Sequence, residues 1–350
     1  MDSAMQSAYL SYALRQLEVL VNIPSPSSFT ENVIDHCAKE LTRMGLNTRR
    51  MPKGGLLASL GGQDDALVLG AHVDTLGAMV CGVKPSGALR VAPIGGLQAN
   101  NIETETARVF ARGGKVYDGT FQLENASVHV NREYAKTART FDTIELVLDE
   151  KTHTADETRA LGIQTGDIVA VAPRFCVTQS GFIKSRFLDD KLSAAILLAY
   201  AKYLKDTGKT PRRKVYLLFT VYEEVGHGGA CLPSDAVEML SVDMGCVGKG
   251  LACDETMVSL CAMDSAGPSS RPVLDALVEA AQNAAVRYAI DVYPHYTSDA
   301  DAALRAGSEV RHCTIGAGVY ASHGYERAHV EGLAATFDLL DMYIGTADRR

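Results

Sequence analysis

Long apolar runs and concentrated positive charge are both missing from this chain of 350 residues. No apolar stretch reaches the roughly 18 to 20 residues that a membrane-spanning helix needs, and the first residues lack the charged region and apolar core of a secretion signal. Lys+Arg 34 against Asp+Glu 42 gives a net charge of −8 without a sustained basic run. The sequence therefore predicts a cytoplasmic protein that binds neither membranes nor nucleic acid.

Paired cysteines are missing as well. The eight cysteines are scattered, without a C-x-x-C pair or zinc-finger spacing, so reduced thiols in the core are the simpler interpretation. A hydrophobic fraction of 47% is ample for a buried core, and the length allows one large domain or two medium ones. These features favour a soluble globular enzyme.

The chain opens with two helical patterns. Apolar residues recur at helical spacing over 9–20, and the Pro-Ser-Pro-Ser-Ser run at 24–28 ends that helix. A second apolar stripe follows a predicted cap at Thr30 and stops at Gly45.

Residues 80–183 differ in texture from the rest of the chain. Short β-like pieces separated by Gly- or Asp-containing turns replace the helical patterns. The expected strands are 89–94, 108–110, 127–130, 144–147 and 168–171. We interpret 80–183 as an inserted all-β domain. Since it has no obvious helices to cover its faces, we expect it to mediate dimerisation.

Strand and helix alternate on both sides of this insert. Strands are expected at 56–60, 67–69, 215–220 and 258–263, a short apolar piece ends at 242–243, and helices are expected at 192–204, 273–288 and 330–344. This alternation predicts a doubly wound, mostly parallel sheet of the α/β class. Residues 1–79 and 184–350 are thus expected to form the catalytic domain.

Acidic and imidazole side chains stand at or near the ends of apolar stretches in this domain. They occur in His72-Val73-Asp74, Asp189-Asp190, Glu223-Glu224 and at Asp243, and His323 lies in a loop near the C-terminus. Carboxylates and imidazoles without thiolates are typical of hydrolytic zinc, cobalt or manganese sites. Two ions can be held by one bridging carboxylate plus one His and one further carboxylate each. The set with that composition is His72, Asp189, Glu224, Asp243 and His323.

The adjacent glutamates are expected to have separate roles, because neighbouring side chains diverge and do not easily bind one ion together. Glu224 would ligate, while Glu223 would act as the general base that takes a proton from water and returns it to the leaving amine. Asp74 follows His72 closely enough to orient its imidazole. Each group alone is more often a cap, a turn residue or a solvated charge, so the prediction rests on their joint occurrence.

Four motifs resemble those of the glutamyl aminopeptidase, or tetrahedral aminopeptidase, family of dinuclear metallopeptidases. They are Ala71-His72-Val73-Asp74-Thr75, Leu188-Asp189-Asp190-Lys191, Tyr222-Glu223-Glu224-Val225-Gly226 and Val242-Asp243-Met244-Gly245. The resemblance spans nearly the whole chain and implies the same five ligands, with Asp189 bridging, and Glu223 as the base. It also implies that Asp299, in Ser298-Asp299-Ala300, lies near the substrate amine. Dimers built into dodecamers are a further implication.

The last motif departs from the usual family pattern. The family usually has a His-Ser-Pro-type turn with a downstream Glu, whereas this chain has Ser322-His323-Gly324-Tyr325-Glu326-Arg327. Together with residues 73–79, this variant also resembles a branch associated with an N-acetylated glutamine dipeptide osmolyte. The resemblance thus leaves open whether the substrate is small peptides at large or one dipeptide derivative.

Three other interpretations compete with a two-metal aminopeptidase of small peptides. A two-metal amidohydrolase or deacylase acting on an N-acylated amino acid or dipeptide would use the same ligands, and only an acidic group for a free amine, such as Asp299, favours the aminopeptidase. The run 316–321 fits the loose dinucleotide pattern G-x-G-x-x-A of an oxidoreductase, but His323 and a further loop follow it, and no second strand ending in an acidic residue comes after. An inactive assembly subunit is disfavoured because every expected ligand type is present.

Overall fold

The computed structural model describes residues 3–348, which form two compact units. Unit 1 combines Met1–Asp74 with Arg174–Arg350, and unit 2 is Thr75–Pro173. None of the helices in the described residues is long and apolar enough to cross a membrane.

Unit 1 contains six of the helices and most of the strands of the described chain. The helices are α1 (Ser3–Asn22), α2 (Glu31–Arg43), α4 (Leu188–Thr207), α5 (Arg271–Asn283), α6 (Asp299–Arg305) and α7 (Val330–Ile344). The strands before the insert are β1 (Thr48–Arg50), β2 (Leu56–Gly61) and β3 (Gln63–His72). Those after it are β10 (Cys176–Val177), β11 (Phe182–Ser185), β12 (Lys209–Pro211), β13 (Arg213–Thr220), β14 (Ala236–Val242), β15 (Gly245–Val247), β16 (Val258–Met263), β17 (Tyr288–Val292), β18 (Arg311–Tyr320), β19 (Glu326–His329) and β20 (Thr346–Asp348).

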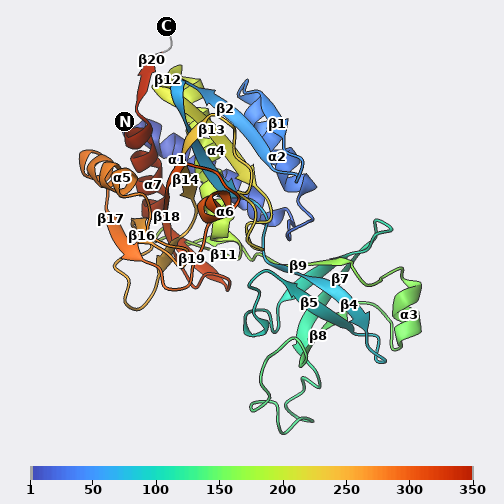
Figure 1. The fold of residues 1–350 in the computed structure, drawn as a ribbon. Helices are drawn as coiled ribbons and strands as arrows, with labels where there is room; N and C mark the ends of the chain where they lie inside the picture. The colour runs from blue at the N-terminus through green and yellow to red at the C-terminus, as the bar shows by residue number, and fades with distance from the viewer. Residues whose placement is uncertain (1–2, 349–350) are drawn as a thin grey trace. The chain divides into compact units, whose positions relative to one another are not determined.

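A 12-stranded mixed sheet forms the centre of unit 1 (Figure 1). Its strand order includes β1-β2-β13-β3-β14-β18-β19-β11-β10, with β15 and β16 paired to β18 and β17 paired to β16. The four central strands β13, β3, β14 and β18 run parallel, while the outer pairs are mostly antiparallel. The predicted α/β class and doubly wound arrangement are confirmed, and their parallel part is the centre of the sheet.

Alternating side chains of the central strands enter two different cores, as the pleat of a strand requires. Leu67 and Leu69 of β3 pack in the larger core with α1, α4 and α7, whereas Val68 packs on the other face with Ala300 and Ala303 of α6. In the larger core, Tyr9 of α1 and Tyr203 of α4 meet edge to face, with ring centroids 5.4 Å apart. Helices on both faces bury the central strands and leave their carboxyl ends as the place for polar groups.

The glycines of the dinucleotide-like run 316–321 serve packing within the sheet. Most of the run belongs to β18, so no turn leading to a helix follows its first glycine. A Cβ atom on Gly316 would lie 1.4 Å from the backbone oxygen of Asp243. The glycine thus permits the close approach of β18 to the chain after β14.

Unit 2 is a closed barrel of six strands in the order β4-β5-β8-β7-β6-β9. The strands are β4 (Gly77–Val83), β5 (Leu89–Ile94), β6 (Thr106–Phe110), β7 (Val116–Leu123), β8 (Ile144–Leu148) and β9 (Ile168–Val171), accompanied by the 3-10 helix η1 (Ala99–Asn101) and the short helix α3 (Ala155–Ala160). Barrel closure leaves no free sheet edge, since each strand pairs with two neighbours.

The limits of the insert differ from the predicted 80–183. The barrel strand β4 begins at Gly77, and β11 pairs with β19 of unit 1, so 174–183 belong to unit 1. The predicted strand 127–130 is wrong, because this segment forms turns and exposes Val128 and Val130 by 60% and 72%. The unit also contains α3, which the all-β interpretation missed; its capping box joins Thr154 and Glu157.

Most other predicted elements of unit 1 are present, and several of them have different ends. Helix α7 and strand β16 have the predicted bounds. The predicted helix 273–288 is shorter, because α5 ends at Asn283 and β17 begins at Tyr288. Thr30 stands at the N-cap of α2, but its side chain makes no capping hydrogen bond.

Candidate metal centre

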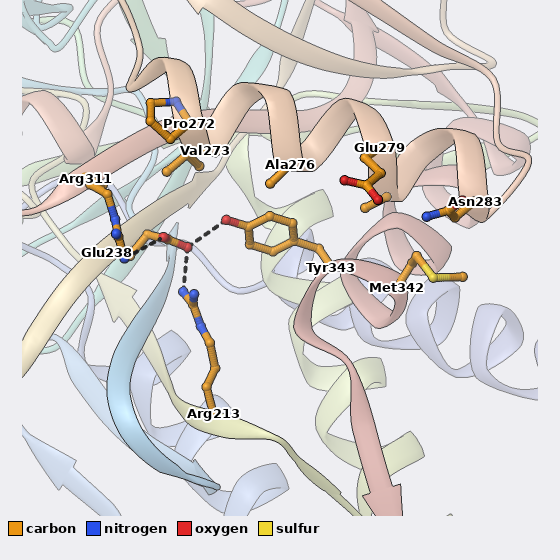
Figure 2. A pocket seen from close by; sticks show the side chains of 11 residues that line it. Arg213, Glu238, Pro272, Val273, Ala276, Glu279, Asn283, Arg311, Met342 and Tyr343 are labelled. Atoms are coloured by element: carbon orange, nitrogen blue, oxygen red, sulfur yellow. Dashed lines mark hydrogen bonds and ion pairs between the residues drawn. The ribbon is translucent and has the colours of Figure 1, made fainter.

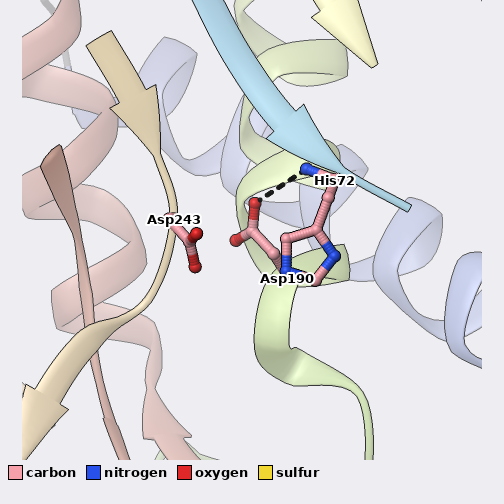
Figure 3. A group of neighbouring side chains, drawn as sticks. All are labelled: His72, Asp190 and Asp243. Atoms are coloured by element: carbon pink, nitrogen blue, oxygen red, sulfur yellow. Dashed lines mark hydrogen bonds between the residues drawn. The ribbon is translucent and has the colours of Figure 1, made fainter. Parts of the chain in front are cut away.

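The predicted site residues gather at the carboxyl ends of the parallel strands. His72 is the last residue of β3, Glu223 and Glu224 lie in the loop after β13, and Asp243 directly follows β14. Figure 3 shows His72 and Asp243 facing Asp190, which comes from the start of α4. Because neighbouring parallel strands end at the same edge of the sheet, residues distant in sequence meet there.

Asp189 lies between two imidazoles. Its Oδ1 is 3.0 Å from Nε2 of His72, and its Oδ2 is 3.6 Å from Nε2 of His323. The first two acidic residues of α4 have non-helical backbone angles, with ψ of 102° at Asp189. One carboxylate thus presents each of its oxygens to a different histidine, as a bridging ligand would.

Two groups of ligand atoms surround this arrangement. Atoms of His72, Asp189 and Glu224 lie within 4.8 Å of one another, and so do atoms of His72, Asp190 and Asp243. His323 adds a further contact to the first group, because its Nε2 is 3.5 Å from Oε2 of Glu224. All five predicted ligand residues therefore come together.

Asp190 is a candidate ligand that the sequence analysis did not assign. One of its carboxylate oxygens accepts a hydrogen bond from the backbone N–H of His72 at 3.2 Å, and the other is buried without a hydrogen-bond partner in the described structure. An unpartnered buried oxygen costs free energy unless a ligand meets it. The Asp189-Asp190 pair is the sequence signal for this candidate, but only Asp189 was predicted to be a ligand.

Glu223 stands apart from both groups of ligand atoms but close to them. Its Oε2 is 3.8 Å from Nε2 of His72, and its backbone N–H donates to Oδ1 of Asp74 at 3.2 Å. Glu224 belongs to a ligand group and Glu223 does not. This difference between adjacent glutamates agrees with their expected divergence.

Asp74 connects His72 with its surroundings. The Nδ1 atom of His72 is 3.0 Å from the backbone oxygen of Asp74 and 3.6 Å from its carboxylate Oδ1. The other carboxylate oxygen accepts a hydrogen bond from the Ser27 hydroxyl at 2.5 Å. The Nδ1 side of the imidazole is thereby fixed, which leaves Nε2 pointing toward Asp189.

Burial and mutual repulsion raise the pKa of several of these carboxyls. Burial, followed by the charge of Asp189, raises the pKa of Asp243 to about 7. Burial is also the main reason that the pKa values of Asp190, Glu223 and Glu224 lie well above their ordinary range, and nearby carboxylates add to it. Such crowded anions are relieved by bound cations.

Burial and the neighbouring charges act in opposite directions on the pKa values of the two histidines. Burial disfavours their charged form, but the hydrogen bond with Asp189 and the surrounding carboxylates outweigh it, so the pKa of His72 is well above its ordinary value and that of His323 is raised to about 9. Burial opposes the charged form of Asp189 too, yet its bonds to both imidazoles lower its pKa. The raised pKa values of both histidines show that this cluster of carboxylates favours positive charge, as a metal site does.

Glu326 is a second group whose role the sequence analysis did not assign. It is buried, and its carboxylate accepts hydrogen bonds from the backbone N–H of Asp189 at 3.1 Å and of His323 at 3.0 Å. It therefore holds Asp189 and His323, the two residues of one of the imidazole contacts. In the sequence, Glu326 stands out only as part of the unusual motif 322–327.

Asp299 is buried behind the loop that carries the two glutamates. One of its oxygens accepts a hydrogen bond from the Thr220 hydroxyl, and the other accepts one from the backbone N–H of Gly229 at 2.6 Å. Burial raises its pKa to about 6, and these bonds oppose the rise. The structure thus places Asp299 close to the start and end of the loop 221–228, while its contact with a substrate amine stays a prediction.

A buried set of carboxylates and imidazoles at the carboxyl ends of parallel strands defines a metal-dependent hydrolase of the α/β class. The M42 glutamyl aminopeptidase family matches residues 54–339 of the chain. The chain belongs to this family and is accordingly a metallo-aminopeptidase, a hydrolase that acts on peptide bonds with divalent metal ions.

Individual relatives extend the likeness over nearly the whole chain. YhfE of Bacillus subtilis (strain 168), which carries a provisional aminopeptidase name, is 41% identical over 331 residues that cover 94% of this chain and 96% of YhfE. The structure of the aminopeptidase APDkam598 from Desulfurococcus kamchatkensis matches with a TM-score of 0.85 at 20% identity, over 97% of this chain and 96% of that one. The TET1 peptidase of Pyrococcus horikoshii matches with a TM-score of 0.84 at 21% identity, over 95% and 99%. The two structural likenesses establish the fold.

Proposed function

We propose that this protein removes the N-terminal residue of small peptides with a free amine, using two divalent ions. The observation that carries the proposal is the position of Asp189, with one oxygen 3.0 Å from His72 and the other 3.6 Å from His323. His72, Asp189 and Asp243 would hold one ion, with Asp190 beside them, and Asp189, Glu224 and His323 would hold the other. Oxygen and imidazole ligands favour zinc or cobalt, with manganese as a third option.

Divalent ions held by these residues would supply Lewis acidity, which would polarise the scissile carbonyl and make water more acidic. The protein's own contribution is proton transfer by Glu223. Its carboxylate lies 3.8 Å from the imidazole of His72, outside the ligand groups. Burial raises the pKa of Glu223, so this carboxyl can keep a proton taken from water until the leaving amine needs it.

Asp74 and Glu326 would orient this machinery without touching the substrate. Asp74 fixes the Nδ1 side of His72 and the backbone of Glu223. Glu326 fixes the backbone of Asp189 and His323. Such supporting hydrogen bonds keep ligands in position before an ion arrives.

A panel of substrates tests the proposed specificity. Free-amine dipeptides, the same dipeptides with an acetylated N-terminus, and amidated glutamine dipeptides should be compared by kcat/KM with the metal-loaded protein. We expect the free amines to be hydrolysed best, because a buried acidic group, Asp299, lies beside the loop 221–228 that carries Glu223 and Glu224. A clear preference for the blocked compounds would replace the aminopeptidase by the amidohydrolase or deacylase alternative.

We also propose a homo-oligomer, with unit 2 contributing to a dimer. The TET1 peptidase, whose fold this chain shares, assembles into a tetrahedron or a large octahedral shell, and another solved TET1 structure is a dodecamer. Light scattering should give an even number of subunits, either a dimer or a dodecamer. A stable, active monomer at micromolar concentration would contradict this proposal.

A further inference from the structure

A cavity of about 390 Å³ lies in unit 1 between the turn that joins β1 to β2 and the loop 221–228. Its lining includes Met51, Lys53, Leu218, Val221, Ala230 and Cys231. This size and a largely apolar wall are typical of sites that bind small molecules. None of the proposed metal ligands is among the described residues that line the cavity. It is therefore a separate feature from the metal centre.

The wall of the cavity lies directly against the loop that carries the two adjacent glutamates. Gly228, in the wall, packs so closely that a Cβ atom on it would lie 2.9 Å from the backbone nitrogen of Glu223 and 2.5 Å from a carboxylate oxygen of Asp299. Val221, at the other end of the loop, also lines the cavity. A molecule in this space would therefore contact both ends of the loop.

Lys53 joins the two walls. Its ammonium donates to the backbone oxygen of His227 and lies 3.3 Å from Nδ1 of the His227 ring. That ring stacks on Tyr222, with centroids 5.0 Å apart, and the His227 N–H donates to the Tyr222 backbone oxygen at 3.1 Å. Because an ammonium has three N–H donors, Lys53 can keep its bond to the His227 oxygen and still bind an anion.

The chemistry of the wall indicates the class of ligand. Lys53 is the single charged side chain among the described lining residues, and the Thr220 hydroxyl is already used by Asp299. The described wall thus offers apolar surface and one cation, without an acidic group for an amine. We propose that the cavity binds a small apolar carboxylate, whose body contacts Leu218 and Val221 and whose charge meets the ammonium of Lys53.

Such a ligand would act on the loop 221–228 from behind. A molecule that contacts both walls favours the arrangement in which they are found, so the loop should open less often when the cavity is filled. Since the loop carries Glu223 and Glu224, occupancy would also be felt at the metal centre. That last consequence rests on the proposed function, whereas binding and stabilisation of the loop do not.

Calorimetry with three probes of the same shape tests the class of ligand. The metal-loaded protein should be titrated with 4-phenylbutanoate, its amide and 4-phenylbutylamine. We expect the carboxylate to bind about fivefold more tightly than the amide, as an exposed ion pair allows, and the amine to bind most weakly. Binding of the carboxylate should persist after treatment with a chelator. Its loss there would place the ligand on the metal ions and overturn the proposal.

Two lysine variants test the role of Lys53. Lys53→Met keeps much of the apolar length of the side chain and removes its charge, so this variant should bind the carboxylate and the amide equally. Lys39→Met is the matched control, because Lys39 is an exposed lysine of α2 outside the cavity wall. It should keep the preference of wild type. A wild-type protein that binds the amide as tightly as the carboxylate, to within about twofold, would contradict the proposed ligand class.

The thiol of Cys231 locates the ligand. It is exposed and belongs to the cavity wall. At about ten times the Kd of 4-phenylbutanoate, alkylation of Cys231 by iodoacetamide should slow about tenfold, because only the unoccupied protein reacts. Alkylation of Cys81, in unit 2, should be unchanged. Mass spectrometry of the two peptides measures both rates, and equal rates for Cys231 with and without ligand would refute this location.

Hydrogen exchange tests the effect on the loop. Amides of residues 221–231 should exchange more slowly when the cavity is filled, while peptides from the barrel of unit 2 should not change. Saturating ligand without any slowing in 221–231 would overturn the stabilisation of the loop. These measurements need no turnover, so they decide the fate of the cavity even if the substrate panel shows no hydrolysis and the proposed function fails.

Discussion

Buried carboxylates lie at both edges of the central sheet in unit 1, where the parallel strands begin and where they end, but they are neutralised in different ways. At the edge where the parallel strands begin, Glu238 of β14 is paired: Arg213 and the Tyr343 hydroxyl donate to one of its oxygens, and Arg311 lies 3.4 Å from the other. Figure 2 shows this arrangement in the wall of a cavity of about 430 Å³. At the edge where the strands end, carboxylates crowd one another and two histidines.

The difference separates structural from functional acidity. A buried carboxylate between two guanidinium groups is neutralised permanently by the protein and connects neighbouring strands. Carboxylates whose pKa values are raised by burial and by neighbouring carboxylates, as those of Asp243 and Asp190 are, are neutralised only by protons or by ions from outside. The paired edge thus serves as an internal control for experiments on the other edge.

Metal removal should have the largest effect on activity. It should affect only the edge of the sheet where the parallel strands end. After dialysis against a chelator, peptide hydrolysis should fall to background, and addition of zinc, cobalt or manganese should restore it, because the five proposed ligand residues offer oxygen or imidazole atoms to the ions. The measurement is hydrolysis of aminoacyl substrates, with metal content determined in parallel. Full activity in a metal-free sample would contradict the contrast between the edges.

The adjacent glutamates should give the next largest effect. Glu223→Gln should lower kcat by about 10² to 10⁴-fold with metal content nearly unchanged, because the amide keeps the shape but cannot transfer the proton. Glu224→Gln should instead lose metal, since a neutral oxygen replaces a charged ligand. Metal analysis of both variants decides the matter. The reverse pattern would show that their roles are exchanged.

Asp74→Asn should have an intermediate effect. The carboxylate of Asp74 supports His72 and the backbone of Glu223 without belonging to a ligand group. Loss of such a supporting charge typically weakens metal affinity by about 10 to 100-fold. Titration with a competing chelator measures the affinity. An unchanged affinity would mean that the backbone oxygen of Asp74, 3.0 Å from Nδ1, orients the imidazole alone.

Glu238→Gln, at the paired edge, should have the smallest effect on catalysis. Removing the charge leaves Arg213 and Arg311 without their carboxylate, which should destabilise the fold by about 3 kcal/mol. Urea denaturation measures this loss, while kcat and metal content should match wild type. Arg311→Gln is a milder control, because the Arg311 side chain is 52% exposed and its ion pair is partly solvated. A large fall in kcat for Glu238→Gln would show that the two edges are coupled.

That the proposed ligand residues come together could be predicted from the sequence, because their positions follow from the strands. His72 and Asp243 each stand where an apolar run stops, and parallel strands bring such positions together. Asp190 was named only as part of the Asp189-Asp190 pair, of which Asp189 alone was predicted to be a ligand. The non-helical backbone at the start of α4 lets both aspartates face His72, and no local pattern in the sequence indicates those angles.

The errors in unit 2 arise from pairing that is not local. Residues 127–130 alternate like a strand but have no partner, and their valines are exposed. Strand β7 was missed because Gly119 and polar residues interrupt its pattern. A Cβ atom on Gly119 would lie 2.6 Å from the backbone oxygen of Val147, so the glycine is explained by its neighbour strand β8. Only the assembled barrel shows which weak patterns have partners.

The hydrogen bonds of Ser25 and Ser27 limit how the enzyme can be shortened. Both serines precede residue 54, where the match to the family begins, yet Ser25 donates to the backbone oxygen of Val73 and Ser27 to the carboxylate of Asp74. A minimal catalytic fragment cut at the start of the matched region would therefore lack two supports of the His72 segment. For anyone designing a smaller or permuted version of this peptidase, the loop between α1 and α2 belongs to the irreducible core, although it carries none of the proposed ligands.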